Sequence, residues 1–367
     1  MGRVYHRRGP AAVRKLLYPD AFTLNALAGR GIHAEVTLHS SGVTVPTPEA
    51  PSLGVWDQVP IRVAAEYTTP DMRSATLSGA LYNPWHNLVT SHFGAPLIDS
   101  TSTVLPIDKR ALTGRFRWGR YKVSGPCTVF RSVHNNYFHT LIDNLARVFL
   151  LRQSCYENVG TLQMLFPTSP TEAEQFFLER YLPDNVEIVV VPDNQYIAPE
   201  TLIFPCFLMR RTMTYLPPSY LQDMLPHFLP KRPRNKRHRI FISRRIGPRG
   251  ELRVIRNESK LYERLKASGF VQYYLEDLSL SDQIELFYDA EVVVAAHGAG
   301  LSNLIFAENI ALVELHPGKM IIPNYYYLCK SLGHQYATWK GNGGHFEDNF
   351  SVDIGQVVEL LPPELRD

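Results

Sequence analysis

The chain has 367 residues, of which 45% are hydrophobic and 20% charged, a balance typical of a globular protein with two domains of ordinary size. Its 38 Lys and Arg against 35 Asp and Glu give a formal net charge of +3, so the global charge does not indicate a nucleic-acid partner. The four cysteines are far apart and include no CxxC pair, which argues against a disulfide scaffold and a structural zinc site.

The first 125 residues are rich in Thr, Val, Ser, Pro and aromatic residues from His33 onward, which is typical of short strands and turns. We therefore expect a β-rich segment over residues 1–125. Two aromatic groups within it, residues 82–86 and 116–118, suit either core packing or a carbohydrate site. The basic N-terminus has no apolar segment of signal-peptide length, and no later stretch approaches eighteen apolar residues, so we expect a cytoplasmic protein.

From Pro126 the pattern changes to alternating strands and helices. Strands are predicted at 127–131, 161–167 and 186–192, and helices at 135–155 and 171–182, the second one capped by Thr171. Such alternation predicts a mostly parallel sheet covered by helices, and we assign residues 126–230 to one Rossmann-like domain.

The helix at 135–155 carries His139 and Asp143 four residues apart, which places both side chains on one face near its start. One interpretation is a hydrogen bond that fixes the beginning of the helix. The functional interpretation is a general base with its orienting partner at the edge of the sheet where ligands of open α/β folds bind.

A basic run follows a predicted helix at 217–229, and we assign its residues 231–239 to an interdomain linker. Blocks of like charge are usually solvated loops, but peripheral contact with an anionic membrane surface stays open as an alternative.

A second α/β pattern occupies residues 240–350, and residues 351–367 are predicted to form a C-terminal helix. Strands are expected at 239–243, 270–276, 291–296, 311–317 and 334–339, with helices at 256–269, 279–290 and 324–333 between them. Asn257 is a candidate cap of the first helix and Gly269 its stop, while Ser279 or Ser281 is expected to cap the second. This order predicts a doubly wound, Rossmann-like domain.

The run EVVVAAHGAGLSNLIFA, residues 291–307, is the centre of this domain and reads as a buried strand, a glycine turn and a helix. Glycines let the backbone approach a ligand, and the unpaired amides of a helix start suit a phosphate, although glycines also occur where a helix packs close to a sheet. The turn contributes the candidate ligand-binding residues His297, Gly298, Ala299, Gly300, Leu301, Ser302 and Asn303.

Polar residues collect where the predicted strands of this domain end, which is the ligand side of a doubly wound sheet. Arginine side chains there could bind phosphate oxygens and acidic ones could accept sugar hydroxyls, while surface ion pairs are the structural alternative. The further candidate nucleotide-binding residues are Ser243, Arg244, Arg245, Asn257, Glu276, Asp277, Leu278 and Glu314.

The runs ISRR, RVIRNESKLYERLKASGF and YYLEDLSLSDQIELFYDAEVVVAAHGAGLSNLIFAENIALVELHP closely resemble the C-terminal domain of glycosyltransferase family 61, and YFHTLIDNLARVF resembles the His–Asp helix of that family. The resemblance covers residues 127–361. It implies the GT-B architecture, in which two Rossmann-like domains face a cleft. It also implies inverting transfer of xylose, arabinose or N-acetylglucosamine from a UDP-sugar to a glycan or glycolipid acceptor, generally without a metal.

The residue chemistry is compatible with this comparison. The sequence has no Asp-x-Asp pair to hold a cation, so Arg244, Arg245 and the turn amides would have to stabilise the departing diphosphate, with no cofactor. His139 is the expected base with Asp143 orienting it, and the swapped assignment stays open. A sugar-nucleotide epimerase or hydrolase, and a catalytically silent nucleotide-binding protein, are the alternative functions.

Overall fold

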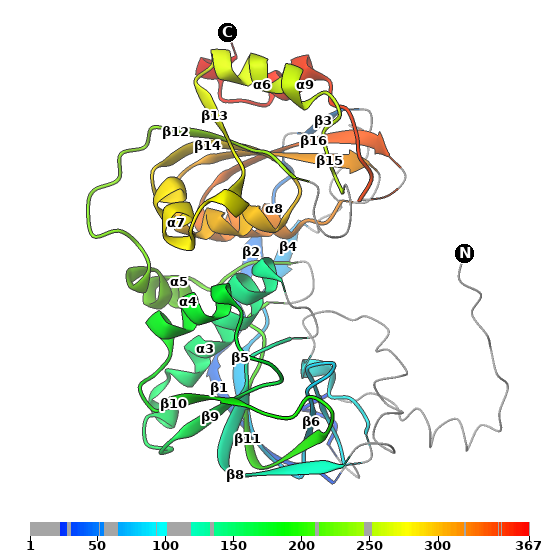
Figure 1. Ribbon diagram of the computed structural model, residues 1–367, viewed down its shortest axis with the longest axis vertical. Coiled ribbons are helices and arrows are strands. Elements are labelled where there is room, and N and C mark those ends of the chain that lie inside the picture. Colours follow the sequence, from blue (N-terminus) through cyan, green and yellow to red (C-terminus); the bar gives the residue numbers. More distant parts are fainter. Residues whose placement is uncertain are drawn as a thin grey trace, which may run out of the picture. The chain divides into compact units, whose positions relative to one another are not determined.

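The computed structural model describes residues 23–27, 31–50, 52–54, 65–92, 94–100, 119–132, 136–209, 213–245, 252–318, 321–343, 345 and 347–366. The chain forms two compact units (Figure 1). Unit 1 comprises Met1–Ser41, Asp71–Asn135 and Asp143–Leu208, and unit 2 comprises Gly42–Pro70, Asn136–Ile142 and Met209–Asp367. The chain therefore passes between the units several times rather than once.

Unit 1 is built on a mixed sheet in the order β1-β5-β11-β8-β9-β10, with β6 and β7 attached beside β11. Strands β11, β8, β9 and β10 run parallel, whereas β1 and β5 pair antiparallel at the other edge. The strands are β1 (His33–Ser40), β5 (Met72–Ser78), β6 (Leu81–Asn83), β7 (Leu88–Thr90), β8 (Arg120–Val129), β9 (Leu162–Phe166), β10 (Val186–Val190) and β11 (Tyr196–Pro205).

The predicted long helix of this region is divided by its hydrogen bonding. A π-helical turn, η3 (His139–Asn144), leads into α3 (Leu145–Leu151), and a 3-10 turn covers Ser154–Tyr156. The border between the units falls inside η3, because residues up to Ile142 belong to unit 2 and Asp143 opens the next part of unit 1. Single π-helical turns are rare and occur often at functional sites.

Helix α4 (Glu172–Tyr181) confirms the predicted Thr171 cap and adds a reciprocal bond. The Thr171 side chain accepts from the amide of Glu174, whose carboxylate in turn accepts from the amide of Thr171. Glu174 is fully buried and also holds Arg131 through two bonds of 2.7 Å. The bidentate pairing compensates both buried charges and ties the start of α4 to the end of β8.

Unit 2 contains a sheet in the order β13-β12-β14-β15-β16-β3, in which every neighbouring pair is parallel. Its strands are β3 (Ser52–Gly54), β12 (His238–Ile242), β13 (Phe270–Tyr273), β14 (Ala290–Ala296), β15 (Ala311–Gly318) and β16 (Gln335–Gly343). Helices α6 (Glu258–Ala267) and α9 (Ile354–Glu359) cover one face, and α7 (Leu280–Tyr288) and α8 (Asn324–Leu332) cover the other (Figure 1). The predicted mixed α/β class with parallel strands is confirmed.

Smaller elements complete unit 2. Strands β2 (Thr44–Pro46) and β4 (Glu66–Thr68) form an antiparallel pair, and α5 (Pro218–Met224) continues into the 3-10 turn Leu225–His227. Further 3-10 turns cover Leu275–Asp277, Ala299–Phe306 and Pro363–Leu365 in this unit, and Ile98–Ser100 in unit 1.

Several local expectations differ from the structure. The described part of the predicted β-rich segment 1–125 contributes β1 and β5 to the sheet of unit 1 and β3 to that of unit 2. The side chain of Asn257 does not cap the helix, because both of its polar atoms bind Val352. Its Nδ2 donates to the carbonyl of Val352, and its Oδ1 accepts from the amide of Val352. The helix expected after the glycine turn is a 3-10 helix. The aromatic residues 116–118 lie outside the described residues.

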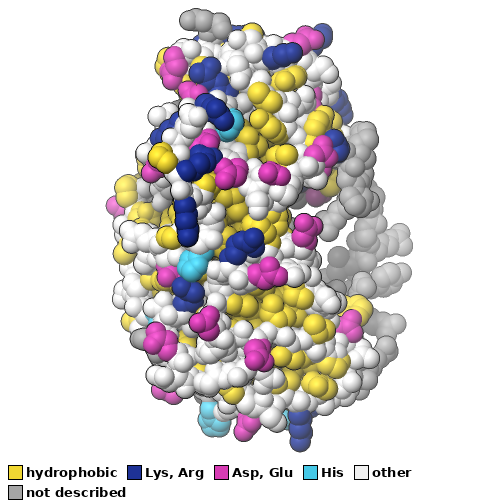
Figure 2. Space-filling view, turned by 60° about the vertical axis from the view of Figure 1, so that its left-hand side comes forward, with side chains coloured by type: hydrophobic (Ala, Val, Ile, Leu, Met, Phe, Trp, Pro, Cys, Tyr) yellow, Lys and Arg dark blue, Asp and Glu magenta, His cyan; other side chains and the backbone are white. Residues whose placement is uncertain are grey.

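The basic run 231–239 is partly neutralised within unit 2. Arg232 pairs with Asp289 at 2.8 Å and also with Glu285, and Arg234 pairs with Glu308 at 3.3 Å. On the face shown in Figure 2, Lys and Arg side chains lie among Asp and Glu side chains. Within the described part of the chain, every helix is too short or too polar to cross a membrane.

The cap of α7 provides a test of the fold. The Ser279 hydroxyl accepts from the amide of Asp282 at 3.1 Å, which decides between the two candidate serines. Ser279→Ala should therefore lower the free energy of unfolding by about 1 kcal/mol. Ser281→Ala is the matched control inside the same helix and should change it by less than about 0.5 kcal/mol. Urea denaturation of both variants measures this, and equal losses would contradict the assigned cap.

Candidate functional site

The strand order of unit 2 reverses between β12 and β14, its central neighbours. The chain runs outward from β12 to β13, then returns to β14 and continues outward to β15 and β16. Helices that follow β12 and β14 consequently lie on opposite faces, and ligands of doubly wound sheets bind beyond the carboxyl ends of two such strands. Ser243 and Arg244 follow β12 there, and His297 and Gly298 follow β14.

Gly298 brings an arginine side chain onto the backbone of the turn. Arg244 Nη1 donates to the carbonyl of His297 at 3.0 Å. A Cβ atom added at Gly298 would lie 2.1 Å from that same Nη1, so only glycine permits the approach. On the other side, the Tyr325 hydroxyl donates to the carbonyl of Gly298 at 2.6 Å. The turn is therefore held in place from α8 while a guanidinium lies against it.

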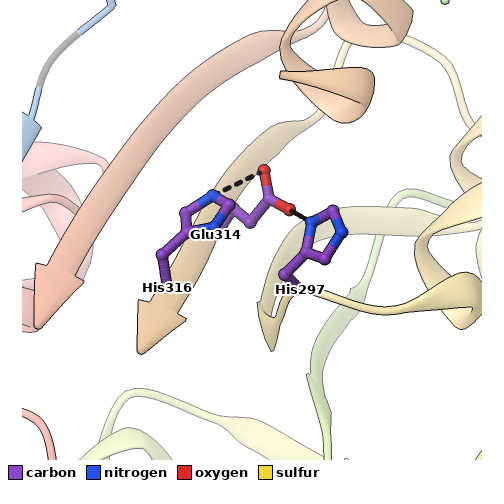
Figure 3. A group of neighbouring side chains, drawn as sticks. All are labelled: His297, Glu314 and His316. Carbon is purple, nitrogen blue, oxygen red and sulfur yellow. Dashed lines mark hydrogen bonds and ion pairs between the residues drawn. The ribbon is translucent and has the colours of Figure 1, made fainter. Parts of the chain in front are cut away.

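A buried carboxylate in the middle of β15 binds the first residue of this turn (Figure 3). Glu314 in β15 is fully buried and its Oε1 lies 2.6 Å from Nδ1 of His297. Its Oε2 accepts from the Tyr336 hydroxyl of β16 at 2.7 Å, and Nε2 of His316 lies 3.4 Å from the same oxygen. The rings of His297 and His316 stack with centroids 5.3 Å apart.

The charge states follow from burial and these partners. Burial alone would raise the pKa of the Glu314 carboxyl, but His316 and His297 hold it well below its usual range, so the carboxylate is ionised. Burial lowers the pKa of His297, and the hydrogen bond to Glu314 opposes this only in part. We therefore assign a neutral His297 at neutral pH, with its Nδ1–H donating to Glu314 and its Nε2 carrying a lone pair.

The three side chains could also offer ligand atoms to a metal ion, because one such atom from each lies within 4.8 Å of the others. Their surroundings favour a hydrogen-bonded network instead. Both oxygens of Glu314 already accept hydrogen bonds, and the positive charge of Arg253 acts on His297. A divalent cation would have to displace the Tyr336 bond or the His297 bond in a site that already carries positive charge.

Arg253 is a residue of this site that the sequence did not single out. Its guanidinium is largely buried, and its positive charge lowers the pKa of Arg244, after the larger effect of burial. Arg253 has φ +57°, a left-handed conformation that is uncommon for residues other than glycine. The local sequence pattern gives no sign that this loop arginine has a function. Its charge comes close to that of Arg244 only in the folded chain.

Arg245 lies in different surroundings from Arg244. It forms a bidentate pair with Asp277, at 2.6 and 2.5 Å, and its guanidinium lies over the Tyr274 ring at 4.5 Å. The side chains of Arg245 and Asp277 are about half exposed. The two predicted residues are brought together, but as a surface ion pair with each other.

The remaining predicted residues have mainly structural partners. The Ser243 hydroxyl donates to Glu258 of α6, and Asn303 donates to Gln283 of α7 at 2.9 Å and to the carbonyl of Gly300 at 3.2 Å. In the 3-10 helix, Leu301 and Ser302 are buried and Ala299 is partly exposed. Before α7, Glu276 is exposed and Leu278 is partly exposed.

The start of the His139 helix belongs to the same unit as the glycine turn. The Tyr137 hydroxyl lies 2.5 Å from Oδ1 of Asn303, and the Phe138 ring meets Tyr325 edge-on with centroids 5.9 Å apart. His139 is the next residue and is partly exposed, whereas Asp143 is 2% exposed. Two contacts thus connect the chain just before His139 to the residues that hold the turn.

Comparison with known proteins gives two matches. Residues 137–318 match the family described as Glycosyltransferase 61. The chain is also similar to the EGF domain-specific O-linked N-acetylglucosamine transferase of Drosophila melanogaster, with 28% identity over 154 residues. That match covers 36% of this chain and 28% of the relative, so the chain spans less than a third of the relative's length.

The different environments of the two arginines give a direct test with pyrophosphate as the anion. Arg244→Ala should weaken pyrophosphate binding by about 1.5 to 3 kcal/mol, because a charge-assisted contact at the turn is lost. Arg245→Ala is the matched control, since its guanidinium is already bound to Asp277, and affinity should change by less than about 0.5 kcal/mol. Calorimetry measures both. Equal weakening in the two variants, or none in Arg244→Ala, would contradict this description of the site.

Proposed function

Because residues 137–318 of this chain belong to glycosyltransferase family 61, we propose that the protein is an inverting glycosyltransferase that uses a UDP-sugar. The acceptor is a hydroxyl of a glycan or glycoconjugate. The observation that carries this proposal is the Arg244 guanidinium lying on the Gly298 turn at the reversal of the strand order. N-acetylglucosamine is the first sugar to consider, since the Drosophila relative is named for its transfer.

On the donor side, the proposed diphosphate lies at the glycine turn. Arg244 and Arg253 contribute two positive charges, and the amides at the start of the 3-10 helix Ala299–Phe306 contribute hydrogen-bond donors. Such donors are fixed before the reaction and stabilise the charge that develops on the leaving diphosphate. The same site would take up this charge without a metal, so metal-independent transfer is part of the proposal.

On the acceptor side, inversion requires one base for the acceptor proton, and we propose the His139/Asp143 pair of η3. His139 is the favoured base with Asp143 orienting it, and Asp143 as direct base is the alternative. The contacts of Tyr137 and Phe138 support this placement, because they connect the chain before His139 to Asn303 and Tyr325 at the turn. The GT-B arrangement, a cytoplasmic location and peripheral membrane contact stay predictions.

A panel of UDP-sugars tests the function. UDP-N-acetylglucosamine, UDP-xylose and UDP-arabinose are incubated with the protein, first alone and then with glycan acceptors, and UDP release is measured. A transferase releases UDP slowly from one donor alone and faster with an acceptor. Rapid UDP release without any acceptor would indicate a hydrolase, and conversion of the donor into another UDP-sugar without UDP release, followed by chromatography, would indicate an epimerase. If none of the sugar nucleotides raises the melting temperature, the donor site is wrong, since ligand at a hundred times its Kd stabilises by about 2.7 kcal/mol.

The base is tested by His139→Ala and Asp143→Asn. Each should lower kcat by at least about a hundredfold, the usual contribution of a positioned general base, while donor affinity changes little. If Asp143 acts only through His139, the double variant should lose little more than the more impaired single variant. Near wild-type turnover in both single variants would leave the pair with a structural role.

Chelation tests the source of leaving-group stabilisation. Transfer should continue in excess EDTA, because the arginines and turn amides take the place of a cation. Complete loss on chelation, with recovery on adding manganese or magnesium, would show that a metal supplies this charge.

A further inference from the structure

We propose that His297 takes up a proton when the donor diphosphate binds, and that its Nε2–H then donates to the oxygen that leaves the sugar. Glu314 is the positioning residue that holds the imidazolium. This inference rests on the proposed function, and it gives the leaving group its own hydrogen-bond donor, separate from the base that acts on the acceptor.

The two ring nitrogens of His297 have different surroundings. Nδ1 is engaged with Glu314 at 2.6 Å. Nε2 lies on the side of the ring away from Glu314 (Figure 3), and within the described residues it has no hydrogen-bond partner. The side chain is 10% exposed, so a small part of the ring is open to a ligand. Nδ1 is therefore bound to Glu314, whereas Nε2 is available to a ligand.

The position of His297 in the chain suits the leaving group rather than the acceptor. His297 directly precedes Gly298, and Arg244 lies against both residues. In an inverting displacement the attacking hydroxyl approaches C1 from the side opposite the departing oxygen. A group beside the diphosphate turn is consequently on the wrong side to take the acceptor proton and on the right side to contact the departing oxygen.

The charges around His297 explain why a proton is taken up. Glu314 and His316 face it from β15, Arg244 and Arg253 lie on the loop after β12, and Tyr325 faces it from α8. Without ligand, burial lowers the pKa of His297, and His316 and Arg253 lower it further against the effect of Glu314. A neutral Nε2 would present its lone pair to phosphate oxygens. The diphosphate charge reverses this balance and favours the imidazolium.

The chemical step breaks one bond at C1 of the sugar and forms another. The bond between C1 and the diphosphate oxygen breaks, and its electron pair stays on that oxygen. The acceptor oxygen forms the new bond to C1 and gives its proton to the base of the His139/Asp143 pair. The released UDP carries one more negative charge than the diphosphate of the donor did. The Nε2–H of His297 faces this new charge, and Glu314 balances the imidazolium from the other side.

Proton uptake can be measured by calorimetry with UDP-N-acetylglucosamine at pH 7.0 in buffers that differ in ionisation enthalpy. This donor is suitable because its diphosphate is esterified at both ends and does not itself titrate near neutral pH. The observed enthalpy plotted against buffer ionisation enthalpy should give an uptake approaching one proton per donor bound. Since the complex holds more protons than the free protein, Kd should rise with pH, by up to about tenfold per unit.

Substitutions identify the side chain that takes up the proton. His297→Gln should bring the uptake close to zero and make Kd nearly independent of pH, while Glu314→Gln should reduce the uptake because the imidazolium loses its carboxylate. His33→Gln, an exposed histidine in unit 1, is the control and should keep the wild-type uptake. Wild-type binding without uptake overturns the inference whatever the variants do. Uptake kept in His297→Gln but lost in His316→Gln also overturns it. Absence of binding by every UDP-sugar would instead remove the proposed function.

Discussion

The site depends on the buried negative charge of Glu314. An unpaired carboxylate with no exposure would cost several kcal/mol, and here hydrogen bonds from His297 and Tyr336 offset that cost. The two partners come from the residue after β14 and from the beginning of β16, so one charge in β15 connects three neighbouring parallel strands. Glu314 binds Nδ1 of His297 and so holds the first residue of the glycine turn in place. It thereby leaves Nε2 as the nitrogen that can contact a ligand.

Backbone and side-chain groups together hold the glycine turn in place. Gly298 lets Arg244 lie on the backbone, Tyr325 holds the carbonyl of Gly298, and the Phe138 ring meets Tyr325. Tyr137 adds a bond to Asn303, which itself donates to the carbonyl of Gly300. The start of the helix that carries His139 is thus connected to the turn that we propose holds the diphosphate. Substitution of Tyr137 or Tyr325 should therefore disturb both the glycine turn and the start of the helix that carries His139.

Periodicity and turn residues predicted unit 2 well, because buried parallel strands are continuous apolar runs and capping residues mark the helices. Ser279, Gly269 and the strand before His297 are examples. Spacing could not separate Arg244 from its neighbour Arg245, since only the fold shows that Asp277 is close enough to bind the second one. Arg253 and Tyr137 were missed because their roles depend on contacts distant in sequence. The placement of β3 in the second sheet was not predictable either, since three residues carry no periodic signal.

We propose above all that the turn after β14 binds the diphosphate of a sugar nucleotide. Determination of the crystal structure with UDP-N-acetylglucosamine tests it most directly. We expect diphosphate oxygens within hydrogen-bond distance of the Arg244 guanidinium and of the amides at the start of the 3-10 helix Ala299–Phe306, with Nε2 of His297 facing the oxygen attached to the sugar. A diphosphate bound elsewhere in the chain, with the turn unoccupied, would contradict it.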